Sequence, residues 1–136
     1  MQASGEPTTQ YKALVVDDSP TLRRLIQLTL GSMGLGVDFA ESGEDAIKLT
    51  IRNHYHIIFL DVVLPKMDGY RVCKILKANK KFRNIPVVML TSKNTPHDKV
   101  KGIMAGTDLY LTKPLDQEKI ISAARKYLPD LGSEAT

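Results

Sequence analysis

Five short apolar runs recur along the chain, and longer segments of mixed polarity separate them. The runs occupy residues 13–16, 37–40, 57–60, 87–90 and 109–111. The first, third and fourth runs are continuous rather than alternating, which is typical of strands buried on both faces of a parallel sheet. The second run is more polar and has Gly34 and Gly36 before it, so we expect it at an edge of the sheet.

The segments between these runs carry apolar residues at helical spacing. Ser19 followed by Pro20 is an N-cap and first-turn pattern, and residues 42–45 resemble a capping box. The five apolar stripes are Leu22, Leu25, Ile26 and Met33; Ala46, Ile47 and Leu49; Val72, Ile75 and Leu76; Val100, Ile103 and Met104; and Ile120, Ile121, Ala124 and Leu128, which Pro129 follows. We expect all five stripes to pack in the core. This alternation of strand and helix predicts a doubly wound α/β fold with right-handed crossovers.

Polar residues that could bind a metal or take part in catalysis follow four of the five predicted strands. They are Asp17 and Asp18 after the first, Asp61 after the third, Thr91 and Ser92 after the fourth, and Lys113 after the fifth. The carboxyl ends of parallel strands share one edge of the sheet, and that edge is where open α/β sheets bind ligands. The sequence therefore predicts one cleft with three carboxylates, two hydroxyls and one ammonium.

Three carboxylates against one ammonium leave an excess of negative charge, which a hard divalent cation such as Mg²⁺ would offset. Asp61 is placed to act as a carboxylate nucleophile that forms an aspartyl-phosphate. Lys113, a hydroxyl and backbone N–H groups are suited to hold the phosphoryl oxygens. Each of these residues alone has an ordinary structural explanation, such as a surface turn for the pair of aspartates. Their joint placement at strand ends favours a metal-assisted phosphoryl site.

Length and composition indicate one ordinary globular domain. The chain has 136 residues, 43% of them hydrophobic and 25% charged. We expect the domain to span residues 11–129, between a flexible polar tail at 1–10 and another at 130–136. Apolar runs of five residues at most are too short to cross a membrane. No secretory signal opens the chain, and the single cysteine, Cys73, fits a reducing cytoplasm.

The net charge is +4 and the pI is about 9.2, which raises the question of a nucleic-acid partner. The basic residues are dispersed, and no nucleic-acid-binding motif accompanies them. We interpret them as a solvated basic surface, and we expect neither nucleic-acid nor membrane binding within this chain.

Four segments carry a resemblance to a known family: LVVDDSPTLRRLI, IIFLDVVLPKMDGY, IPVVMLTSK and GTDLYLTKPL. Together they resemble the receiver domain of two-component response regulators, including the stand-alone chemotaxis regulator. The resemblance extends from about residue 12 to residue 128. It implies a flavodoxin-like fold with five parallel strands in the order 2-1-3-4-5.

The resemblance also implies a role for each residue at the sheet edge. Asp61 is the expected phosphoacceptor, and Lys113 is expected to pair with the phosphoryl group. Asp18 is the expected direct ligand of Mg²⁺, Asp17 its partner through a water molecule, and Val63 a ligand through its backbone carbonyl. The complete set of expected active-site residues argues against a degenerate receiver.

A switch is the second implication of the resemblance. Thr91 is the expected switch hydroxyl, and Tyr110 occupies the position of the switch aromatic, with an outward and an inward position. The fourth helix, fifth strand and fifth helix form the expected output face. Receivers of this kind commonly have a cis peptide before the proline that follows the lysine, and we expect one between Lys113 and Pro114.

The predicted function is a phosphorylation-controlled signalling switch rather than a conventional enzyme. Its expected partners are a histidine kinase or phosphotransfer protein as phosphodonor and a downstream protein target, and we expect a monomer or a weak phosphorylation-dependent dimer. Finer resemblance points to twitching-motility and chemosensory regulators.

One alternative is a small hydrolase of the haloacid dehalogenase type, which also forms an aspartyl-phosphate. Another is a DNA-binding regulator without its output domain.

Overall fold

The computed structural model describes residues 11–92 and 96–129. Strands and helices alternate in the order β1 (Lys12–Val16), α1 (Pro20–Ser32), β2 (Gly36–Ala40), α2 (Gly43–Arg52), β3 (Ile57–Asp61), α3 (Gly69–Ala78), β4 (Val87–Thr91), α4 (Pro96–Ala105), β5 (Leu109–Thr112) and α5 (Gln117–Tyr127). The two predicted tails lie outside the described residues, so the domain limits stay a prediction.

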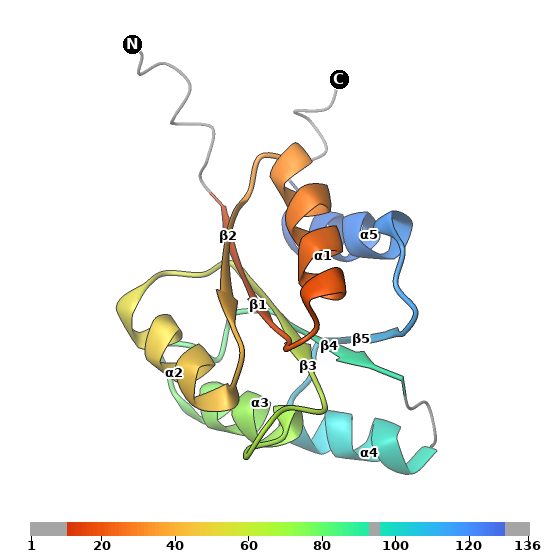
Figure 1. Ribbon diagram of the computed structural model, residues 1–136. Coiled ribbons are helices and arrows are strands. Elements are labelled where there is room, and N and C mark those ends of the chain that lie inside the picture. The colour runs from red at the N-terminus through yellow and green to blue at the C-terminus, as the bar shows by residue number, and fades with distance from the viewer. Residues whose placement is uncertain (1–10, 93–95, 130–136) are drawn as a thin grey trace.

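The five strands form one parallel sheet in the order β2-β1-β3-β4-β5. This is the predicted flavodoxin-like α/β fold, and β2 lies at an edge as expected. Helices α1 and α5 cover one face of the sheet, and α2, α3 and α4 cover the other (Figure 1). No helix among residues 11–92 and 96–129 has the length and apolar character needed to span a bilayer.

Strands β1, β3 and β4 are apolar over residues 13–16, 57–60 and 87–90, because both of their faces are covered there. Successive side chains of a strand point to opposite faces. In β1, Ala13 and Val15 pack with Ile26 and Ile120 from α1 and α5. Leu14 and Val16 belong to the core on the other face, together with Val72 and Leu76 of α3 and Ala46 of α2. The continuous apolar pattern therefore reflects two cores, one on each side of a single sheet.

Helix starts follow the capping chemistry expected of the sequence. The Ser19 hydroxyl accepts a hydrogen bond from the Leu22 N–H, and the Ser42 hydroxyl accepts one from the Asp45 N–H. Asp68 and Asp116 are the N-caps of α3 and α5. Each cap satisfies a backbone donor that has no partner inside the helix.

The prediction that every apolar stripe is buried is wrong for α4. Val100, Ile103 and Met104 are 56%, 75% and 73% exposed, and Ile75 of α3 is also exposed. Helix α4 instead packs inward through Gly102 and Ala105, because the Tyr110 ring of β5 occupies the space beneath it. A Cβ atom on Gly102 would lie only 2.2 Å from the Tyr110 hydroxyl oxygen.

Candidate functional site

The carboxyl edge of the sheet brings together the residues that follow the strands. Asp61 and Thr91 are the last residues of β3 and β4, and Asp17 and Lys113 come directly after β1 and β5. Strand pairing fixes their alignment, since Asp61 pairs with Leu90 and Thr91 pairs with Thr112. Four segments that are distant in sequence therefore meet at one edge.

The Lys113 ammonium lies between two carboxylates of this edge. Its Nζ is 3.1 Å from Asp61 Oδ2 and 3.5 Å from Asp17 Oδ2. The backbone holds the lysine in place, because its N–H donates to the Thr91 carbonyl over 2.8 Å. The peptide bond between Lys113 and Pro114 is cis, which confirms the expected geometry.

Asp61 is almost fully buried, and the loop that follows β3 orients its carboxylate. Its Oδ1 accepts a hydrogen bond from the Val63 N–H over 3.1 Å. The Gly69 N–H donates to the Val62 carbonyl over 2.8 Å, which folds the start of α3 back onto this loop. One oxygen of Asp61 is thereby bound to the loop, and the other faces Lys113.

Two adjacent carboxylates at the end of β1 have different surroundings. Asp17 is fully buried, and its Oδ1 accepts from the Ser19 N–H over 2.6 Å. Asp18 is exposed. Carboxylate oxygens of Asp17, Asp18 and Asp61 lie within 4.8 Å of one another, which is close enough for a shared metal ion.

The electrostatics of the cleft fit a bound cation. Burial raises the pKa of Asp61, and the nearby Asp17 raises it further, against the opposing effects of the Val63 N–H and the Lys113 ammonium. Burial alone would lower the pKa of Lys113, but the attraction of Asp17 and Asp61 outweighs it and raises the net pKa. A set of oxygen ligands with excess negative charge is the type that Mg²⁺ occupies in proteins.

Of the other predicted site residues, Thr91 is buried at 3% exposure, and Ser92 and the Val63 side chain are exposed. The fit of Val63 to a metal site rests on its backbone, which already contacts Asp61 through the N–H. Thr91, Ser92 and Val63 all lie at the carboxyl edge of the sheet, where the sequence analysis expects them.

Tyr110 has partners that the sequence analysis missed. Its hydroxyl donates over 2.7 Å to the Asp98 carbonyl of α4 and lies 2.8 Å from the Tyr70 hydroxyl of α3. The Tyr70 hydroxyl also donates to the Asp98 carbonyl, over 3.1 Å. In the sequence, the only indication of this contact is Tyr70 at the start of the third predicted helix. The Tyr110 ring is half-buried against the core, packed under α4.

Comparison with known protein families gives a match over most of the chain. The family described as the response regulator receiver domain matches residues 13–125. Protein PilG of Pseudomonas aeruginosa is 41% identical over 118 residues, which are 87% of this chain and 87% of that protein. Three further curated relatives are named as transcriptional regulators and are 34% to 36% identical, and the chain spans about half of their length.

Solved structures agree with this match. The chemotaxis response regulator CheY4 of Vibrio cholerae superposes with a TM-score of 0.83 at 29% identity, over 88% of this chain and 100% of that one. The receiver domain of the sensor histidine kinase PA1611 from Pseudomonas aeruginosa superposes with a TM-score of 0.80 at 27% identity, over 88% of this chain and 98% of that one. The PA1611 structure has a magnesium ion coordinated in its active site cleft.

Proposed function

This chain belongs to the response regulator receiver domain family, and from that premise we propose that Asp61 accepts a phosphoryl group from the phosphohistidine of a partner histidine kinase or phosphotransfer protein. The observation that carries the proposal is the position of the Asp61 carboxylate, 3.1 Å from the Lys113 ammonium and within 4.8 Å of two further carboxylates. Membership of this family marks the protein as a signalling module rather than a conventional enzyme, so the hydrolase alternative loses its support.

The proposed transfer uses groups that the cleft already holds in place. A carboxylate oxygen of Asp61 attacks the phosphorus atom in line with the P–N bond, and the imidazole nitrogen of the partner keeps the electron pair when that bond breaks. The loop holds the other oxygen of Asp61 through the Val63 N–H, so the carboxylate stays oriented during the attack. Lys113 is the group placed to balance charge on the phosphoryl oxygens, because its ammonium already lies against the acceptor.

Mg²⁺ is the metal that suits this donor set, and when bound it would neutralise the negative charge of the carboxylates and the phosphoryl group. We assign Asp18 as a direct ligand and Asp17 as a partner through water, with Asp61 and the backbone carbonyl of Val63 completing the protein ligands. Asp17 is committed to the Ser19 N–H and Lys113, whereas Asp18 is exposed at the same edge. This difference supports unequal roles for the two residues.

Signal output is proposed to run from Thr91 through Tyr110 to the face formed by α4, β5 and α5. Thr91 ends β4 and pairs with Thr112 of β5, two residues beyond Tyr110. A phosphoryl group on Asp61 adds negative charge and acceptor oxygens, toward which the Thr91 hydroxyl would move. The switch can be only as large as the difference in interaction between the two states. We propose a chemotaxis-type output, in which this face binds a downstream protein target.

Incubation with acetyl phosphate, with and without Mg²⁺, followed by intact-mass measurement, tests the proposal. The wild-type protein should gain one acid-labile phosphoryl group only when the metal is present. Asp61→Asn should gain none, and Asp116→Asn is the matched control because asparagine also caps helices well. Phosphorylation of Asp61→Asn at the wild-type rate would show that another residue is the acceptor.

A companion experiment addresses the metal ligands through heat stability. Mg²⁺ should raise the melting temperature of the wild-type protein by binding only to the folded state. Asp18→Ala should remove this increase more completely than Asp17→Ala. The increase is compared within each variant, because loss of the buried Asp17 side chain also destabilises the metal-free protein.

A further inference from the structure

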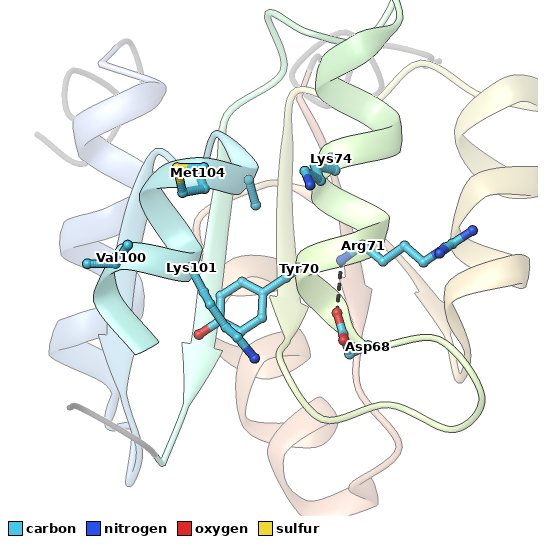
Figure 2. Close-up of a pocket in the computed structure, with 8 residues that line it drawn as sticks. Asp68, Tyr70, Arg71, Lys74, Val100, Lys101 and Met104 are labelled. Carbon is cyan, nitrogen blue, oxygen red and sulfur yellow. Dashed lines mark hydrogen bonds between the residues drawn. The ribbon is translucent and has the colours of Figure 1, made fainter. Parts of the chain in front are cut away.

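A groove separates α3 from α4 on the surface, away from the cleft that holds Asp61. It has a volume of about 470 Å³, within the range of roughly 300–1,000 Å³ that is usual for ligand pockets. Figure 2 shows Tyr70 reaching across from α3 toward α4, with Val100 and Met104 on the α4 side. Val100 and Met104 are 56% and 73% exposed, so the groove presents apolar surface to solvent.

The Tyr70 hydroxyl and the Asp68 carboxylate, which lie beside the apolar part of the groove, already have hydrogen-bond partners. The Tyr70 hydroxyl already lies within hydrogen-bond distance of the Asp98 carbonyl and the Tyr110 hydroxyl. Asp68 accepts from the Arg71 N–H as the helix cap, and the Arg71 side chain extends away toward α2 (Figure 2). The exposed apolar surface is therefore available for contact with another apolar group.

Positive charge borders this apolar surface on both sides. Lys74 lines the groove from α3, and Lys101 lines it from α4, with its Nζ 5.9 Å from the centre of the Tyr70 ring. Between Asp68 and Asp108 the sequence has nine lysines and arginines against three aspartates, a net charge of +6, whereas the whole chain carries +4. The rest of the chain is accordingly at −2, so the excess of positive charge lies in the stretch of sequence that contains these two helices.

From this combination we propose that the α3–α4 groove binds an acidic amphipathic helix of a partner protein. Apolar side chains one turn apart would enter the groove against Tyr70, Val100 and Met104, as in other helix-in-groove complexes. Carboxylates beside them would face Lys74 and Lys101, which gives both selectivity and faster association. The groove lies on the α3 side of α4, whereas the proposed output face continues from α4 to β5 and α5. None of the residues that line the groove belongs to β5, α5 or the cleft of Asp61, so binding there goes beyond the proposed function.

A display library of random 16-residue peptides, selected on the unphosphorylated 136-residue protein, tests the proposal. The enriched peptides should carry several carboxylates around apolar residues spaced three or four apart. Their affinity should fall at least tenfold for the double variant Lys74→Glu/Lys101→Glu and for Met104→Glu. It should also fall as salt rises, because exposed charge pairs are screened.

Matched controls on α2 separate a specific groove from general attraction. Lys48, Ile51 and Arg52 are exposed on that helix, so the double variant Lys48→Glu/Arg52→Glu and the variant Ile51→Glu change charge and apolar surface to a similar degree elsewhere. Both controls should bind the selected peptides within twofold of wild type. Equal losses in the controls, enrichment of peptides without acidic residues, or no enrichment at all would overturn the proposal. Binding of phosphatidylglycerol vesicles that depends on Lys74 and Lys101, without peptide binding, would assign the groove to membranes instead.

Discussion

At Gly69 the start of α3 passes so close to the backbone of the acceptor that no side chain fits. A Cβ atom there would lie 2.2 Å from the Asp61 carbonyl oxygen and 2.9 Å from the Val62 Cα. Both neighbours are backbone atoms, so neither can rotate away. The glycine is therefore required for space rather than for an unusual backbone conformation, and it sets how close α3 lies to the acceptor.

We expect Gly69→Ala to lower the free energy of unfolding by about 1–3 kcal/mol, the usual effect of overpacking. It should also slow phosphorylation, because the same loop orients the Asp61 carboxylate. Urea denaturation and the acetyl phosphate assay measure the two effects. Gly31→Ala in α1 is the control, since a Cβ there meets nothing within 4 Å. That variant should be unchanged or more stable by up to about 1 kcal/mol, and similar losses in both variants would contradict the explanation.

Asp38 gives a pH-dependent contribution to stability on the edge strand β2. Its carboxylate accepts from the Tyr55 hydroxyl over 2.7 Å and lies 3.0 Å from Lys12 Nζ. Burial alone would raise the pKa of Asp38, but the Tyr55 hydrogen bond and the Lys12 charge outweigh it and lower the net pKa. A lowered pKa means that the stabilisation is present above the pKa of the unfolded chain and is lost as pH falls through the folded value.

Asp38→Asn should therefore be less stable than wild type at pH 7. The difference in unfolding free energy between the two proteins should shrink as the pH falls below the ordinary aspartate pKa of about 3.9. Urea denaturation of both proteins at a series of pH values from 7 downward measures it. A difference that stays constant over this series would show that the ionised carboxylate is not the stabilising form.

At the scale of elements, Lys77 joins α3 to the segment before β4 and to the start of β5. Its Nζ donates to the carbonyls of Arg83 and Ile85 over 3.0 and 2.8 Å, and it lies 2.7 Å from Asp108 Oδ2. The same Asp108 oxygen accepts from the Val87 N–H. From the sequence, this lysine belongs to the solvated basic surface, because nothing local shows which partners the loop will bring near it.

We expect Lys77→Met to lower the free energy of unfolding by about 1–3 kcal/mol, because partly buried carbonyl and carboxylate groups lose their donor. Methionine keeps the length and apolar stem of the side chain, so the change isolates the ammonium. Lys80→Met, at an exposed position nearby, should stay within about 0.5 kcal/mol of wild type in the same urea denaturation. Equal stability of the two variants would contradict a structural role for Lys77.

The helices also show where pattern reading succeeds and where it fails. The caps at Ser19 and Ser42 and the buried strands could be predicted because they depend on neighbours in sequence. The α4 stripe could not, because its burial depends on what lies beneath the helix. Tyr110 fills that space, and α4 turns its small residues inward and its large apolar residues outward. Periodicity predicts an apolar face, but it does not say which element covers that face.

At the scale of the whole molecule, the candidate site could be predicted because parallel strands deliver their carboxyl ends to one edge. Asp61 ends such a strand, and Asp17 and Lys113 come directly after two others, so their proximity could be predicted. The link between Tyr70 and Tyr110 and the α3–α4 groove could not be predicted in this way. Both arise from side chains that meet between helices, at distances that strand order does not fix.

Gly102 leaves room for Tyr110 under α4 because it has no side chain. A Cβ atom at Gly102 would lie 2.2 Å from the Tyr110 hydroxyl oxygen and 2.3 Å from its Cε2. The ring would have to leave this position and give up the hydrogen bond to the Asp98 carbonyl. If Tyr110 is the switch aromatic of the proposed function, Gly102→Ala removes its inward position while Asp61 stays intact.

We therefore expect Gly102→Ala to hold Tyr110 in its outward position whether or not the acceptor is occupied. Fluorine NMR of protein labelled with 3-fluorotyrosine measures this, with Tyr110→Phe to assign the resonance. Beryllofluoride, as a mimic of the phosphoryl group, should move the wild-type resonance toward the buried position and leave that of Gly102→Ala in place. Because Gly102 lies outside the cleft of Asp61, the variant should still gain a phosphoryl group from acetyl phosphate. A Tyr110 resonance that responds equally in both proteins would show that the packing of α4 over this ring does not control the switch.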